Sequence, residues 1–155
     1  MKKRGGYYLI PQFIETKMSY EIISVRKRKT IKIKTPMDIY KAIKQHVRNE
    51  QELFLVITLN ASNEIIAIHI ASMGSANMTI IQPREIFKHA VRDNVAAIIV
   101  AHNHPSGALE PSHEDVGITQ RIIEAGKILG IPVIDHLIIS KLNYYSFGQD
   151  GEIPD

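Results

Sequence analysis

The sequence VAAIIVAHNHPSGALEPSHED, residues 95–115, carries the clearest information about how this chain folds. Its first seven residues are all apolar, which predicts a strand at 95–101 that is buried on both faces. The Pro-Ser-Gly sequence at 105–107 predicts an immediate turn, and Ser112 is a suitable N-cap for a following helix. A buried strand that leads through a short loop into a helix is typical of layered α/β domains.

The segment after Ser112 continues this alternation of helix and strand. Gly130 and Pro132 are expected to end the predicted helix, and 132–140 then reads as a long strand. The helix would bury an apolar stripe with 4-3-4 spacing, formed by Ile118, Ile122, Ala125 and Leu129.

Upstream of residue 95 the sequence predicts three strands and a helix. The runs 53–59 and 64–71 read as strands joined by the Asn-Ala-Ser-Asn turn at 60–63, and a short third strand is predicted at 78–81. These three strands would form an antiparallel meander. A helix is predicted over 84–92, directly after a proline that suits its first turn.

The region before residue 50 predicts one further helix and a hairpin. The sequence TPMD at 35–38 combines an N-cap threonine, a proline at the first helical position and an acid that completes a capping-box pair. This helix would run to about Arg48. The alternating Ile-Lys-Ile-Lys at 31–34 predicts a half-exposed strand with 20–25 as its hairpin partner. Together these elements indicate a layered α/β or α+β domain with a mixed sheet.

Composition and charge divide the chain into two parts. A chain of 155 residues that is 45% hydrophobic can build one sizeable core, so 35–155 is assigned to a single domain. Residues 1–34 form a basic arm or hairpin with ten Lys and Arg against two acids, whereas the remainder carries nine against fourteen. Such an arm attracts nucleic-acid phosphates by long-range electrostatics. A solvated strand and turn explains the same pattern, because no aromatic residue is interleaved among the charges at 26–29.

The N-terminal sequence and the hydropathy predict a cytoplasmic protein. The basic residues at 2–4 are followed by an apolar stretch that is too short for a signal peptide. The longest uninterrupted apolar run, 95–101, is far below the roughly 18 residues that cross a bilayer. We therefore expect no membrane partner.

Two histidines and an aspartate form a candidate metal site. His102 and His104 are two apart at a strand end, so both imidazoles project to one side. The strand-turn-helix arrangement brings Asp115, in the first helical turn, back over them. Because the chain has no cysteine, this His-His-Asp set with an open fourth position predicts one catalytic Zn²⁺. Two alternatives remain: a harmless histidine pair at the surface, and an Asp115 that only forms a capping box with Ser112.

Zinc-activated water also needs a proton acceptor that later protonates the leaving group, and a glutamate that does not bind the metal commonly has this role. Glu52, at the entry to the strand 53–59, is the best candidate. Spacing alone does not select it over the other glutamates nearby, which are Glu50, Glu64 and Glu85.

The remaining histidines have no ligand spacing. His136, inside the strand predicted at 132–140, reads either as a partner of a metal ligand or as a hydrogen-bonded core residue, and it stays outside the ligand set. His69, His89 and His113 carry no metal prediction, and the last two are predicted at the surface.

The spaced motifs resemble a known family. HNHPSG at 102–107, Pro-Ser at 111–112, Asp115 and Asp-His-Leu at 135–137 are similar to the RadC family of bacterial JAMM-domain metalloproteins, over about residues 52–148. The resemblance implies a three-layer α/β fold like that of cytidine deaminases, with a mixed sheet and helices on both faces. Longer members carry an N-terminal helix-hairpin-helix region, and we expect this chain to be a short form without it.

The resemblance also implies a role for each site residue. His102, His104 and Asp115 would bind Zn²⁺, Glu52 would be the general base, and Ser112 would help to stabilise the oxyanion. The family carries a DNA-repair name, which by itself identifies no substrate.

The sequence suggests three functions, of which one is favoured. The leading prediction is a zinc metallopeptidase or isopeptidase-like hydrolase that acts on an unknown protein or peptide. A zinc nucleobase deaminase is disfavoured, because that chemistry expects cysteine ligands. The alternative from another class is a nucleic-acid-associated accessory protein, related to DNA repair or mobile elements, that uses the arm at 1–34 and has a non-catalytic metal site. Apolar edge strands further suggest an oligomer.

Overall fold

A mixed six-stranded sheet forms the centre of the domain. The computed structural model describes residues 3–4, 7–8, 22–23, 30–47, 51–74 and 81–153. The sheet has the strand order β3-β5-β4-β6-β7-β8. Its strands are β3 (Ile22–Ile23), β4 (Leu53–Leu59), β5 (Ile65–Met73), β6 (Ala97–His102), β7 (Val133–Ile139) and β8 (Tyr144–Ser146). A separate two-stranded sheet pairs β1 (Lys3–Arg4) with β2 (Tyr7–Tyr8).

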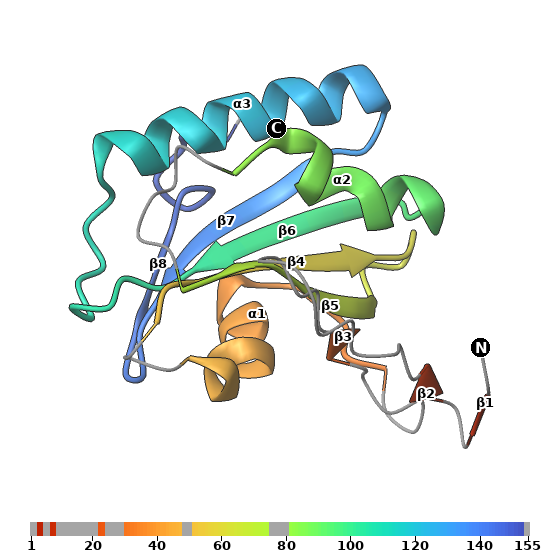
Figure 1. The fold of residues 1–155 in the computed structure, drawn as a ribbon, viewed down its shortest axis with the longest axis horizontal. Helices are drawn as coiled ribbons and strands as arrows, with labels where there is room; N and C mark the ends of the chain where they lie inside the picture. Colours follow the sequence, from red (N-terminus) through yellow and green to blue (C-terminus); the bar gives the residue numbers. More distant parts are fainter. Residues whose placement is uncertain are drawn as a thin grey trace.

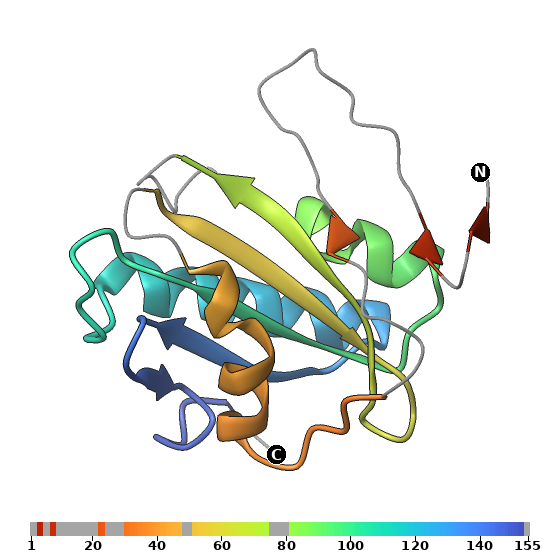
Figure 2. The same ribbon diagram turned by 90° about the horizontal axis from the view of Figure 1, so that it is seen from below.

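Helices cover both faces of the six-stranded sheet, which confirms the predicted three-layer α/β architecture. Helix α1 (Pro36–Ile43), extended by the 3-10 turn η1 (Lys44–His46), lies on one face. Helices α2 (Pro83–Arg92) and α3 (His113–Leu129) lie on the other face (Figure 1). Helix α3 is the crossover between β6 and β7, the only parallel pair among the described strands; the neighbouring pairs are antiparallel. The view from below shows α1 crossing the sheet (Figure 2).

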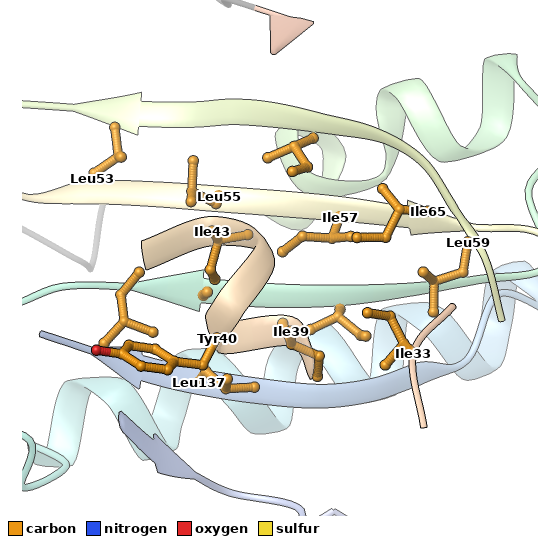
Figure 3. Packing of buried hydrophobic residues seen from close by; sticks show 14 of the residues in the cluster. Ile33, Ile39, Tyr40, Ile43, Leu53, Leu55, Ile57, Leu59, Ile65 and Leu137 are labelled. Atoms are coloured by element: carbon orange, nitrogen blue, oxygen red, sulfur yellow. The ribbon is translucent and has the colours of Figure 1, made fainter. Parts of the chain in front are cut away.

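Each face of the sheet has its own apolar core. On the α1 side, Ile39 and Ile43 pack against isoleucines and leucines of the central strands (Figure 3). The second core lies beneath α2 and α3. Strand β6 contributes to both, because Ile99 faces the first core and Ile98 the second, and neither is exposed to solvent. Truncating either isoleucine to alanine would cost about 2–5 kcal/mol.

Local sequence signals set the helix starts as predicted. Thr35 caps α1 and exchanges hydrogen bonds with Asp38 in a capping box, with Pro36 at the first helical position. Ser112 caps α3 in the same way with Asp115. These caps satisfy amide groups that have no partner within the helix, and each contributes roughly 1 kcal/mol.

Helix α3 buries a shorter stripe than the sequence suggested. Ile118 and Ile122 are buried, but Leu129 is 48% exposed, so its predicted place in the stripe was wrong. The helix packs closely at Gly126 instead, because an added Cβ there would lie 2.5 Å from the carbonyl oxygen of Ile131. Gly126 is therefore the tightly packed residue near the end of the helix, and the side chain of Leu129 lies partly in solvent.

The predicted pairing of 20–25 with 31–34 was also wrong for the described residues. Ile22 and Ile23 pair with β5, and Lys32 forms an isolated bridge to Glu64 at the start of the same strand. Both segments thus pair along the side of β5 that faces away from β4, where the backbone groups of β5 would otherwise have no partner. The third strand predicted at 78–81 lies mostly outside the described residues.

Strand β8 (Tyr144–Ser146) was not predicted from the sequence, since it is too short for an alternating pattern to stand out.

Within the described part of the chain, no helix combines the length and the apolar character needed to cross a membrane.

Candidate metal centre

The three predicted ligands meet at one end of the sheet. His102 is the last residue of β6, His104 lies two residues further on, and Asp115 stands in the first turn of α3. The loop between β6 and α3 leads from the end of the strand to the start of the helix, and both lie at the same end of the sheet (Figure 1). The fold therefore brings together residues that are thirteen positions apart in sequence.

The donor atoms converge on one small space. The Nε2 atoms of His102 and His104 are 3.1 Å apart, and they lie 3.0 and 3.1 Å from the two carboxylate oxygens of Asp115. One ligand atom from each residue lies within 4.8 Å of the others, so the group could hold a metal ion. Among the described residues this is the only such group.

The two carboxylate oxygens of Asp115 differ in their surroundings, so the helix cap and a metal ligand are compatible roles for this residue. Oδ2 accepts a hydrogen bond of 2.7 Å from the backbone N–H of Ser112 and completes the capping box. Oδ1 is buried and has no hydrogen-bond partner in the described part of the chain. A buried carboxylate oxygen without a partner is costly. The residues present therefore fit a cation, which would satisfy Oδ1 without disturbing the cap.

Both histidines present Nε2 to this space and use Nδ1 for hydrogen bonding. Nδ1–H of His104 donates to the carbonyl oxygen of Ala108 at 3.0 Å. Nδ1 of His102 lies 2.8 Å from Nε2 of His136. Such partners behind a ligand fix the ring orientation in metal sites. His136 is thus a neighbour of a candidate ligand, which is one of the two roles considered for it.

The carboxylate and burial have opposite effects on the two histidines. The hydrogen bond and charge of Asp115 raise the pKa of His104, whereas complete burial lowers the pKa of His102 despite the same carboxylate. Burial alone would raise the pKa of Asp115, but its close contacts with Nε2 of both histidines and the hydrogen bond from the backbone N–H of Ser112 outweigh this effect and hold the pKa well below its usual range. The carboxylate is therefore ionised at neutral pH and can attract a cation.

Glu52 lies at the same end of the sheet. It immediately precedes β4, and the antiparallel register pairs Phe54 with His102. Glu52 is 7% exposed, and burial raises the pKa of its carboxyl group, an effect opposed by His104 and reinforced by Asp115. The glutamate therefore interacts electrostatically with two of the three candidate ligands.

Asn103, between the two histidines, fixes the backbone on both sides of Glu52. Its side-chain oxygen accepts from the N–H of Leu53 at 2.9 Å, and its side-chain nitrogen donates to the carbonyl of Gln51 at 3.0 Å. The N–H of Gly74 holds the carbonyl of Glu52 itself. The sequence does not indicate these hydrogen bonds, because it does not show which strand lies beside Asn103.

Ser112 is exposed and exchanges hydrogen bonds with the candidate ligand Asp115. Its Oγ accepts the N–H of Asp115 at 3.1 Å. As an acceptor in that bond, the hydroxyl keeps its own hydrogen available to donate.

Sequence reasoning missed Thr119 and misplaced His89. Thr119 Oγ1 lies 2.6 Å from Nδ1 of His136. Four-residue spacing places Thr119 on the helical face of Asp115, which was the available signal. His89 was predicted at the surface but is only 8% exposed and stacks on His69; His113 is exposed as expected.

The fold and this group of side chains together define a class. A three-layer α/β domain with a His-x-His strand end and an aspartate on the next helix is a metalloprotein domain of the JAMM type, and at family level this class comprises metal-dependent hydrolases.

Comparisons with known proteins identify the family within this class. Residues 33–152 match the family described as RadC-like JAB domain, so the chain belongs to the RadC family. The UPF0758 protein of Alkaliphilus metalliredigens is 47% identical over 119 residues, which are 76% of this chain and 51% of that protein. The UPF0758 protein of Methanosarcina mazei is 40% identical over 121 residues, 77% of this chain and 53% of that protein. The chain spans about half the length of the curated relatives it matches.

The basic arm lies largely outside the described residues. Of residues 1–34, the structure describes 3–4, 7–8, 22–23 and 30–34, and the charge run at 26–29 is not among them. Nucleic-acid binding by the arm, like an oligomeric state, stays a prediction.

Proposed function

We propose that this domain is a zinc-dependent hydrolase that cleaves an amide bond in a peptide or isopeptide. The observation that carries the proposal is the buried Oδ1 of Asp115, which lacks a hydrogen-bond partner among the described residues and lies 3.0 Å from Nε2 of His102. Two imidazoles and a carboxylate are the ligand set of catalytic zinc sites. A bound zinc ion supplies Lewis acidity, which makes water a nucleophile near neutral pH.

Glu52 is the proposed general base. Burial raises the pKa of its carboxyl group above the ordinary value, which makes the carboxylate a stronger base for accepting a proton and returning it to a leaving amine. Asn103 holds the backbone on either side of it, which would limit movement of the carboxylate relative to the ligands. This arrangement favours Glu52 over Glu64, which lies at the far end of β4 and accepts a hydrogen bond from Asn60.

Ser112 is the proposed oxyanion donor. Its hydroxyl accepts from Asp115, so the free hydroxyl hydrogen can point toward a substrate oxygen near the ligands. A donor of this kind stabilises negative charge that develops in the transition state.

The proposal is tested by cleavage of peptide and isopeptide libraries with zinc-loaded protein. We expect Glu52→Gln to lower the rate by roughly 100-fold or more while zinc content is unchanged, because it removes only proton transfer. Glu64→Gln is the matched control and should cleave like the wild type. Full cleavage by the folded Glu52→Gln protein would refute the assignment of the base. Absence of cleavage by the wild type on every amide and isopeptide substrate would refute the proposed activity.

A further inference from the structure

A chain of hydrogen bonds runs from His102 into the core, away from the candidate metal position. Nδ1 of His102 lies 2.8 Å from Nε2 of His136, and Nδ1 of His136 lies 2.6 Å from Oγ1 of Thr119. The hydroxyl of Thr119 in turn donates to the carbonyl oxygen of Asp115 at 2.6 Å. Each of these side chains is buried.

Chemistry fixes the direction of every bond in this chain. The carbonyl oxygen of Asp115 can only accept, so the single hydroxyl hydrogen of Thr119 is used there. The Thr119 oxygen must then accept from His136, which places the hydrogen of His136 on Nδ1 and a lone pair on its Nε2. That lone pair accepts from Nδ1–H of His102. In neutral His102, Nε2 therefore carries no hydrogen.

We propose that Thr119 and His136 are positioning residues that hold His102 in the tautomer whose Nε2 lone pair faces the metal. The inference rests on the proposed metal site and explains why His102 is already in the form that binds a metal. A neutral imidazole binds a metal through an unprotonated nitrogen, and the partner of the other nitrogen decides which one that is. The opposite tautomer of His102 would set two lone pairs against each other at 2.8 Å.

Packing holds the intermediate ring in place. His136 is fully buried and stacks on Phe147, with 4.8 Å between ring centroids and 12° between planes. The ring of Phe54 also packs near His136, with 5.8 Å between ring centroids and 58° between planes. A ring fixed in this way cannot turn to exchange its two nitrogens without disturbing the core.

The same chain of hydrogen bonds also connects two candidate ligands, His102 and Asp115. Thr119 lies one turn after Asp115 on α3, and its hydroxyl binds the backbone carbonyl of that ligand. His102, on β6, is thus connected through β7 to the helix that supplies the carboxylate. His104 provides an internal control, because its Nδ1–H binds the backbone carbonyl of Ala108 and depends on neither positioning residue.

The first test reads the tautomers in the metal-free protein at pH 8 by long-range ¹H–¹⁵N correlation of the imidazole rings. In the wild type we expect hydrogen on Nδ1 of both His102 and His136. Thr119→Val keeps the shape of the side chain but removes the acceptor, so the signals of both rings should change while those of His104 stay. Thr119→Ser should restore the wild-type pattern. A wild-type spectrum with hydrogen on Nε2 of His102 would overturn the inference, even if the valine variant fails to fold.

The second test measures zinc affinity by competition with a chelator. We expect Thr119→Val to bind zinc roughly 10- to 100-fold more weakly than the wild type, with Thr119→Ser close to the wild type. Wild-type affinity in a folded Thr119→Val protein would contradict the role. Neither test needs a substrate, so the positioning role of Thr119 and His136 can be confirmed even if the protein cleaves no amide. If the wild type binds no zinc, the proposed function fails, while the tautomers still decide whether the hydrogen-bonded chain exists.

Discussion

Two pairs of buried histidines lie on the sheet face that α2 and α3 cover, and they differ in almost every other respect. His102 and His136 are tilted by 52° and are joined nitrogen to nitrogen at 2.8 Å. His69 and His89 stack face to face, with ring centroids 4.2 Å apart and 5° between planes. Neither nitrogen of His69 has a hydrogen-bond partner in the described part of the chain.

The electrostatic surroundings differ as well. Asp115 turns both its oxygens toward histidine nitrogens in the first region. The acid near the stacked pair, Asp93, is held by Arg92 at 2.6 Å. Burial lowers the pKa of His69 to about 4, and the charge of His89 adds to this effect. Among the described residues, only the first region combines buried histidines with a carboxylate that no arginine or lysine pairs, and only this group could hold a metal ion.

The largest expected effect comes from removing the carboxylate that distinguishes the two regions. Asp115→Asn keeps the shape of the side chain but removes a ligand charge, so zinc affinity should fall by more than roughly 100-fold, beyond the loss of a supporting group. Competition with a chelator measures this. His69→Phe, in the stacked pair, should bind zinc like the wild type. Equal zinc loss in both variants would erase the distinction between the regions.

The stacked pair should contribute to the response to acid instead of to zinc binding. Between pH 6.5 and about 4 the unfolded chain binds a proton at His69 that the folded protein does not. Stability is therefore lost as the pH falls through this window, by about 3 kcal/mol for this group, and levels off below it. Urea unfolding of metal-free protein at several pH values should show a shallower acid loss for His69→Phe. An identical slope in the variant and the wild type would contradict the assignment.

A smaller effect is expected from removing the clamp around Glu52, that is, the two hydrogen bonds from the side chain of Asn103 to the backbone of Gln51 and Leu53. Asn103→Ala leaves the buried N–H of Leu53 and the carbonyl of Gln51 without their side-chain partner, which should lower the free energy of unfolding by about 2 kcal/mol. Cleavage should fall further than zinc affinity, because the base and not the ligands loses its support. Asn143→Ala, in the exposed turn before β8, is the control with little expected effect. Unchanged stability and cleavage in Asn103→Ala would remove the clamp from the account.

Much of the fold could be predicted because its signals are local. The buried strand at β6, the strand at β4 and the capped starts of α1 and α3 follow from short patterns of apolar, proline and capping residues. The grouping of the candidate ligands could be predicted in the same way, since the strand-turn-helix connection of His102 to Asp115 is short.

What could not be predicted depends on pairing between distant segments. The association of Ile22–Ile23 with β5 requires knowledge of which edge is free, and edges are not visible in a local pattern. Thr119 and His136 meet only because β6 and β7 are parallel neighbours beneath α3. For the same reason the burial of His89 was missed, because its partner His69 lies on another element.

The most direct test of the central claim is the zinc content of protein purified without an affinity tag, measured by elemental analysis. The wild type and His69→Phe should each carry about one zinc per chain, whereas His104→Ala and Asp115→Asn should carry none while remaining folded. A folded wild type without zinc, even after reconstitution, would contradict the metal centre and with it the proposed hydrolase.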